Sequence, residues 1–183
     1  LFATLIIGTI IQQIGTFIGG DIGNMIFIAG KLAASLTGAG IGVAVAYKFK
    51  ESPLVVVSAA TAGMAGAFAS SILAEKVFVD GAMVFAGPGE PLGAFIAAYV
   101  GIVFGHMVSG KTKVDILVTP VVTIGSGCIV GFLIGPPISG FMSWLGSLIN
   151  WGTEQQPFLM GIIVSVIVGI ALTLPISSAA ICM

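Results

Sequence analysis

The sequence contains no arginine and little charge of either sign. Charged residues make up 7% of its 183 residues, against roughly 25% in soluble domains. Hydrophobic residues reach 57%, and the mean hydropathy is +1.20. A soluble fold with so few charges would expose large apolar patches. The composition therefore predicts an all-α, polytopic membrane protein, because each helix that crosses the hydrocarbon core needs about 20 apolar residues.

The chain also lacks the charge and the sequence motifs of several functional classes. A net charge of −1 gives no reason to expect nucleic acid as a partner. The chain has no P-loop, dinucleotide fingerprint, zinc-type spacing or nucleophile–base pair. Its two cysteines, Cys128 and Cys182, stand alone in apolar runs and are expected to be small buried hydrophobes. We therefore expect no catalytic residue, metal or cofactor in this chain, and a lipid bilayer around it.

Five to six apolar runs are candidates for membrane-spanning helices. The expected spans are Leu1 to Ile18, Met25 to Tyr47, Leu54 to Leu73, Leu92 to Val108, Val114 to Ile134 and Phe158 to Leu174. No basic segment precedes the first run, so a signal peptide is not expected. A start at Leu1 instead indicates a fragment of a longer protein.

The expected domains follow from these runs. Residues 1–134 form a transmembrane scaffold of five helices, and residues 157–183 hold a sixth helix and the start of a broken segment. Between them, Gly135-Pro136-Pro137 is expected to end the fifth helix, because proline lacks an N–H and clashes with the preceding turn. Apolar residues then recur every three to four positions from 138 to 152, with two tryptophans among them. Residues 135–156 are therefore predicted to hold an amphipathic helix in the headgroup region and a connection.

Two short loops, which we call the lysine loops, predict the topology. They are residues 48–53, after the second span, and residues 109–113, after the fourth, and each carries two lysines. Because two spans separate them, both fall on one side of the membrane, which the positive-inside rule makes cytoplasmic. The amphipathic helix is then expected on the outer face. A Gly-rich helix, a lysine loop and an apolar helix occur at 38–73 and again at 101–134, which indicates an internal repeat.

Charged and titratable residues inside apolar runs are candidates for substrate binding. Lys31 lies in the second span, where a charge is costly and is usually functional or paired. Its possible partners are Asp21 and Glu90, and the alternative is that it snorkels to the outer interface. His106 lies near the end of the fourth span. It could bind a sugar hydroxyl or relay a proton, or it could simply lie at the cytoplasmic interface.

Glu90 and the uncharged amides complete the set of candidates. Glu90 lies between helix breakers in Gly87-Pro88-Gly89-Glu90-Pro91. A carboxylate there could accept hydrogen bonds from sugar hydroxyls, or the segment could be an outer loop before a helix that starts at Pro91. Asn24 and the pair Gln12-Gln13 could contact substrate or form interhelical hydrogen bonds.

A family resemblance appears from residue 116 onward. The segments ILVTPVVTIG, FLIGPPISGF and WLGSLINWG resemble the membrane subunit, enzyme IIC, of bacterial phosphoenolpyruvate-dependent sugar phosphotransferase systems. In that family a helix containing a proline ends in a Gly-Pro pair and leads into an amphipathic interfacial helix; Pro120, Gly135 and Pro136 match this arrangement. Asp115 and the segment LPISSAA at 174–180 are similar to the branch that includes perfringolysin O regulator-type proteins.

The resemblance implies a homodimeric sugar permease in the bacterial cytoplasmic membrane. It would take up a sugar and present it to a phosphorylated cytoplasmic IIB-type partner, so that this chain is at most the membrane component of a sugar phosphotransferase. The sugar-binding histidine and glutamate of the family usually lie in the later half, beyond this stretch. Two other functions stay open: a membrane regulator with the same fold, and an ion-coupled secondary transporter.

Overall fold

The regular structure of this chain is almost entirely helical. The computed structural model describes residues 2–79, 82–83, 87, 89–155, 161–162, 165–166 and 169. Its elements are α1 (Phe2–Ile18), α2 (Gly20–Ser35), α3 (Thr37–Lys48), α4 (Pro53–Ala67), α5 (Ala69–Leu73), β1 (Phe78–Val79), β2 (Ala82–Met83), α6 (Pro91–Val108) and α7 (Asp115–Gln155). The two strands are two residues each and pair with each other antiparallel. All other described elements are helices, so the predicted all-α class is confirmed.

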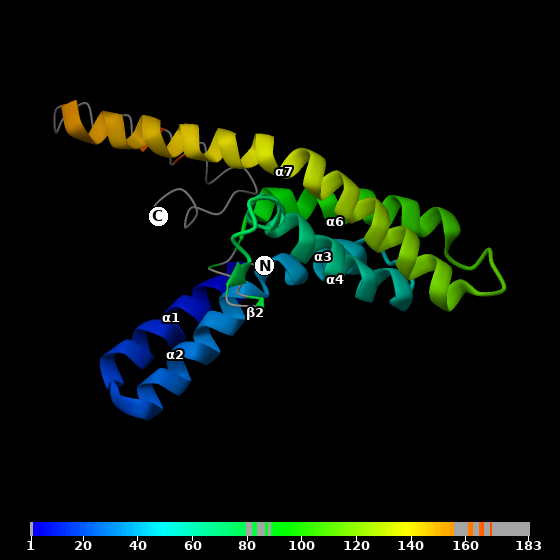
Figure 1. The fold of residues 1–183 in the computed structure, drawn as a ribbon, viewed down its shortest axis with the longest axis horizontal. Coiled ribbons are helices and arrows are strands. Elements are labelled where there is room, and N and C mark those ends of the chain that lie inside the picture. Colours follow the sequence, from blue (N-terminus) through cyan, green and yellow to red (C-terminus); the bar gives the residue numbers. More distant parts are fainter. Residues whose placement is uncertain are drawn as a thin grey trace.

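Helices α3, α4, α6 and the first half of α7 pack into a bundle (Figure 1). Its core is built from small and β-branched side chains, among them Val55, Ala59, Ala98 and Ile102, each at most 2% exposed. Helix α3 is joined to α4, and α6 to α7, by one lysine loop each, and both loops lie on the right in Figure 1. The repeat predicted from the sequence therefore corresponds to two helical hairpins packed against each other.

Glycines set how closely the bundle helices approach. On α7, a β-carbon added at Gly127 would meet Ala62 of α4, and one at Gly131 would approach the backbone of Gly66 at 3.1 Å. Close backbone contact of this kind stabilises helix pairs in lipid, where burial of apolar side chains gives little driving force. The glycine repeat on α7 therefore makes contacts within the chain.

Helices α1 and α2 form a hairpin that projects from one end of the bundle (Figure 1). A β-carbon added at Gly15 of α1 would lie 2.7 Å from the Gly23 carbonyl oxygen of α2, and one at Gly8 would lie 3.0 Å from that of Gly30. The hairpin is apolar on its outside, with Phe17 88% exposed. Such a surface requires lipid or another protein around it.

The expected second span is interrupted. Helices α2 and α3 meet at Leu36 with a bend of 43°, where the sequence predicted one helix from Met25 to Tyr47. The hydroxyl of Ser35 donates to the Leu32 carbonyl at 2.9 Å, and that of Thr37 donates to the Ala34 carbonyl at 2.7 Å. Hydroxyls that hydrogen-bond backbone carbonyls within a helix favour bending, and two of them flank this break.

The predicted helix stop at Gly135-Pro136-Pro137 is wrong. Helix α7 continues through all three residues to Gln155, with a third proline at Pro120. Prolines remove intrahelical hydrogen bonds without forbidding a helix, and packing holds α7 on both sides of this pair. A β-carbon at Gly135 would meet Ala69 of α5, and Ile138 is only 8% exposed. The second half of α7 then leaves the bundle.

The membrane-spanning elements can be identified by length and composition. Helices Pro91–Val108 and Asp115–Leu148 are long and apolar enough to cross a bilayer, and the bent pair α2–α3 makes a third candidate. Leu5–Ile18 and Pro53–Ala67 are shorter apolar helices. These five segments overlap the first five expected spans, but the first and third are shorter than a bilayer-crossing helix needs. The sixth, from Phe158 to Leu174, lies largely outside the described residues.

Helix α7 is longer than a bilayer requires. Its 41 residues extend about 60 Å, twice the hydrocarbon thickness. The part beyond the bundle carries exposed aromatics: Phe141, Trp144 and Trp151 are each about half exposed. This composition remains typical of a helix at a membrane interface, now as an extension of a spanning helix.

Candidate functional site

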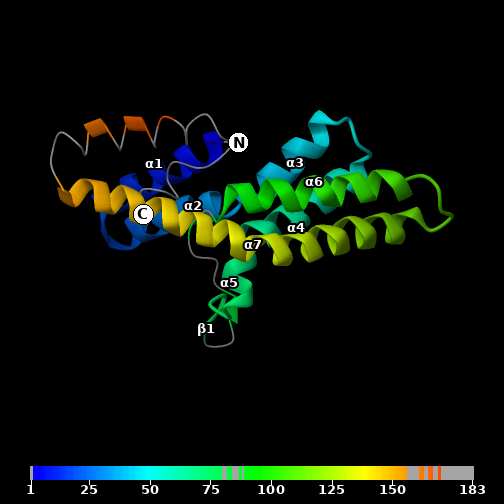
Figure 2. The same cartoon turned by 90° about the horizontal axis from the view of Figure 1, so that it is seen from above.

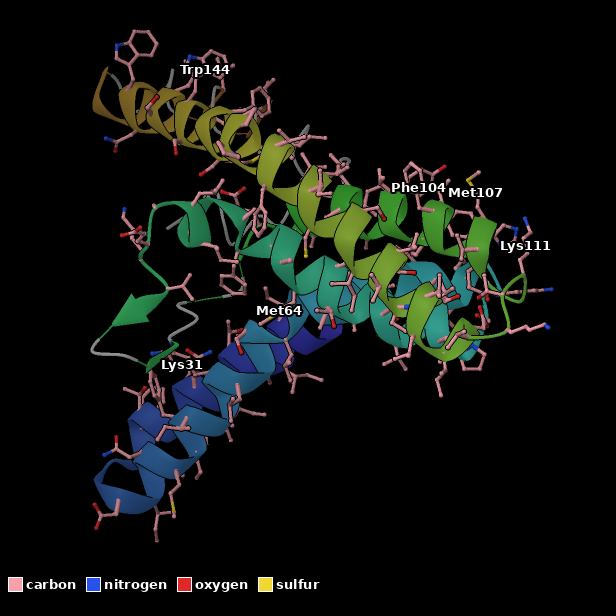
Figure 3. All side chains as sticks on the ribbon, turned by 45° about the vertical axis from the view of Figure 1, so that its right-hand side comes forward. Lys31, Met64, Phe104, Met107, Lys111 and Trp144 are labelled. Atoms are coloured by element: carbon pink, nitrogen blue, oxygen red, sulfur yellow. The ribbon has the colours of Figure 1, made fainter. Side chains whose placement is uncertain are left out.

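The four residues predicted to contact substrate lie in separate places. Asn24 and Lys31 are on α2, in the projecting hairpin, whereas Glu90 and His106 are at opposite ends of α6. Sixteen helical steps separate the last two, or roughly 24 Å. Figure 3 shows Lys31 on the hairpin and Lys111, close to His106 in sequence, at the far end of the bundle. The fold therefore does not bring them together as one binding site.

Asn24 and Lys31 lie on one face of α2, because seven residues make about two helical turns. Both side chains are exposed. Among the described residues, no ion pair joins Lys31 to Asp21 or to Glu90. The lysine stem can extend along the apolar helix toward an interface. Gln12, on α1, packs against α2: its Cγ would lie 2.9 Å from a β-carbon added at Gly30.

Glu90 is held at a junction of three chain segments. Its backbone N–H donates to the Ala67 carbonyl at the end of α4, at 2.7 Å. Gly89, with φ of +68°, passes so close to Ala67 that a β-carbon there would lie 2.8 Å from the same carbonyl oxygen. Pro91 then starts α6 with φ suited to a first helical turn. The helix breakers thus give Glu90 a defined position.

The Glu90 side chain points to the third segment, α7. Its carboxyl lies near the Ser139 side chain. Burial raises the pKa of Glu90 above its ordinary value of 4.5, and the nearby Ser139 hydroxyl opposes that rise. A half-buried carboxyl with remaining acceptor capacity can bind hydroxyl groups of a ligand.

A hydroxyl-lined hollow adjoins this junction. It has a volume of about 550 Å³ and lies between α5, the turn after it and the middle of α7. Four serines and a lysine contribute to its lining: Ser70, Ser71, Lys76, Ser139 and Ser143. Figure 2 shows α5 and β1 projecting from the side of the bundle next to α7.

At the other end of α6, His106 contacts the first of the two lysine loops. Its Nδ1 lies 3.0 Å from Oε2 of Glu51, in the loop between α3 and α4. The hydroxyls of Ser52 and Ser109 are hydrogen-bonded at 2.9 Å. The two lysine loops therefore lie at one end of the molecule, as a position on the same side of the membrane requires; the side itself stays a prediction. The aromatic rings of Phe49 and Tyr99 lie 5.9 Å apart beside this contact.

A second hollow lies at this end, with a volume of about 370 Å³. The residues that line it are Phe49, Glu51, Tyr99, Ile102, Val103, His106 and Met107. Its lining is largely apolar, with one carboxylate and one imidazole that already bind each other. The Glu90 end therefore has more uncommitted hydrogen-bonding groups and is the better candidate for binding a polar ligand.

The sequence singles out Glu90 as a candidate but not the serines of this hollow. Ser139 and Ser143 fall in the predicted interfacial helix, and Ser70 and Ser71 fall near the end of the third expected span. The available signal was the spacing of Ser139 and Ser143, four residues apart directly after a proline pair. That spacing places both on one helix face, but it does not tell which element faces them.

Comparison with known proteins gives one result. A family profile described as "Phosphotransferase system, EIIC" matches residues 1–183. The chain matches no curated protein and no solved structure.

Proposed function

Because this chain belongs to the enzyme IIC family of the phosphotransferase system, we propose that it binds a sugar and carries it across the membrane for phosphorylation by a cytoplasmic IIB-type partner. The observation that carries the proposal is the family match over residues 1–183. The apolar helices and their spanning length support it. The chain itself supplies the membrane scaffold, and the partner supplies the phosphoryl group.

The orientation is part of the proposal. Four of the six lysines are in the two lysine loops at one end of the bundle, and short loops rich in lysine favour the cytoplasmic side. The cytoplasmic partner would then dock at this end. The hollow beside Glu90 would face outward, toward arriving sugar. We further propose a bacterial cytoplasmic membrane and a homodimer, for which the exposed apolar hairpin α1–α2 offers a surface.

Sugar uptake tests this function. The full-length protein, produced with its partner subunits in a bacterial strain lacking its own sugar phosphotransferase permeases, should accumulate radiolabelled sugar as sugar phosphate. Accumulation should require phosphoenolpyruvate and should persist when an ionophore collapses the proton gradient. A strain that accumulates no sugar phosphate from any sugar tested, although the protein is in the membrane, would contradict the proposal.

One observation favours a second function, an ion-coupled secondary transporter. The break at Leu36 between α2 and α3, with its 43° bend, is the kind of discontinuous helix that binds ions in such transporters. Uptake of unmodified sugar that stops with the ionophore would favour this alternative. A regulator with the same fold would neither bind nor transport sugar, and its deletion would change gene expression.

A further inference from the structure

The hollow beside Glu90 is formed by three segments that are distant in sequence. Helix α5 contributes Ser70 and Ser71, the turn after it contributes Lys76, and α7 contributes Ser139 and Ser143. Its volume of about 550 Å³ falls within the range of small-molecule sites, roughly 300–1,000 Å³. It lies at the end of the bundle away from the lysine loops.

Local geometry directs the α7 hydroxyls into this hollow. Ser139 and Ser143 are four residues apart, so they lie on the same helix face. Gly140 also lines the hollow and, having no side chain, leaves room for a ligand. One turn earlier, a β-carbon at Gly135 would lie 2.6 Å from the Ala69 β-carbon. This contact holds α5 directly against α7.

Two of the polar groups have unused hydrogen-bonding capacity. The Ser70 hydroxyl oxygen is buried and has no hydrogen-bond partner among the described residues. A buried hydroxyl without a partner is unfavourable, and such groups in proteins usually bind water or a ligand. The Ser139 hydroxyl lies near the Glu90 carboxyl, and its lone pairs can accept a hydrogen bond from a ligand. The hollow thus offers both donors and acceptors.

We propose that this hollow is an entry subsite for a neutral, hydroxyl-rich sugar on the membrane face opposite the lysine loops. The inference rests on the proposed transport function. Sugar hydroxyls both donate and accept, as do the serine hydroxyls, while Lys76 donates. An apolar ligand would leave the serines without partners.

Equilibrium binding tests the subsite. The full-length protein in detergent is titrated with radiolabelled glucose, galactose, mannose, fructose and lactose, and with inorganic phosphate as the anionic comparison. The variants are Ser70→Ala, Ser139→Ala and Ser143→Ala. Each should weaken binding of the preferred sugar about two- to tenfold, the effect of losing one neutral hydrogen bond.

A matched control is available on the same helix. Ser147 is exposed and donates to the Trp144 carbonyl at 2.8 Å, outside the hollow, so Ser147→Ala should bind sugar as the wild type does. Size-exclusion chromatography and circular dichroism verify folding of each variant. If one serine variant fails to fold, Lys76→Gln, which changes an exposed side chain in the lining, provides the same test.

The possible results of these experiments distinguish failure of the proposed subsite from failure of the proposed transport function. Wild-type sugar affinity in all folded hollow variants would overturn the subsite while leaving transport standing. Binding of phosphate with no binding of neutral sugars would overturn it as well. If the wild type also fails to accumulate sugar phosphate in cells, the proposed function fails, and the subsite fails with it.

Discussion

The Nδ1 atom of His106 lies 3.0 Å from the Oε2 atom of Glu51, and this contact joins the last turn of α6 to the loop between α3 and α4, 55 residues earlier in sequence. The Glu51 side chain is 10% exposed, whereas that of His106 is 71% exposed. The carboxylate is therefore fixed in the packed end of the bundle and the imidazole covers it from outside. This contact, together with the hydrogen bond between Ser52 and Ser109, makes the two lysine loops one surface.

Labelling of introduced cysteines should place this surface in the cytoplasm. With Cys128 and Cys182 replaced by alanine, Lys48→Cys and Lys113→Cys should react with a membrane-impermeant maleimide only in permeabilised cells. Lys76→Cys, at the opposite end of the bundle, should react in intact cells. Labelling of Lys48→Cys and Lys113→Cys from opposite sides would contradict the topology, because the structure joins their loops.

The contact between His106 and Glu51 should contribute little to stability. A double-mutant cycle with Glu51→Gln and His106→Asn, measured by thermal unfolding in detergent, should give a coupling energy of about 0.2–1 kcal/mol, since the imidazole is largely exposed to solvent. Glu75→Gln combined with His106→Asn is the control, and its effects should add because the residues lie at opposite ends. A coupling of several kcal/mol would show that the imidazole is not solvated as described.

Two glycines of α3 should respond oppositely to alanine. A β-carbon at Gly42 would overlap the Ala59 carbonyl oxygen of α4, whereas one at Gly40 would meet no atom within 4 Å. Gly42→Ala should destabilise the bundle by about 1–3 kcal/mol through overpacking. Gly40→Ala should be neutral or stabilise by up to about 1 kcal/mol, because alanine favours a helix. Thermal unfolding of the two variants provides the measurement, and equal midpoints would refute this packing.

Stability should depend on the protonation of Glu90. Its pKa is raised by burial, so the folded state binds the proton more tightly than the unfolded state does. The favourable contribution is fully present below the ordinary value of 4.5 and is lost as the pH rises through the higher folded pKa. Glu90→Gln should remove this dependence.

This prediction is checked by thermal unfolding of Glu90→Gln and the wild type between pH 4 and pH 8, a window of roughly 4 units that starts near the ordinary carboxyl pKa. The plots of unfolding midpoint against pH should diverge. The midpoint of the wild type should fall relative to that of the variant as the pH increases. Glu75→Gln, which changes an exposed acid, should run parallel to the wild type. Parallel curves for Glu90→Gln would show that the carboxyl is solvated.

The ends of a helix were predictable where the limits of an apolar run coincide with a proline or a lysine loop. The expected start of the fourth span at Leu92 and its end at Val108 differ little from α6, Pro91–Val108, because a proline and a lysine loop flank an uninterrupted apolar run. The predictions failed at Leu36 and at Gly135. At Leu36, hydrogen bonds from side-chain hydroxyls favour a bend between α2 and α3. At Gly135, packing against α5 lets α7 continue through two prolines.

The sequence alone determined the environment and the class of this protein. A chain with 7% charged residues exposes too much apolar surface for water and needs lipid around it, and a proline at the start of an apolar run, as at Pro91, marks where a helix begins. Only the tertiary structure decided which residues meet. Glu90, Ser139 and the α5 serines converge because glycines let α4, α5, α6 and α7 approach backbone to backbone. Such contacts between distant segments depend on the packing of whole helices, which no local pattern of residues contains.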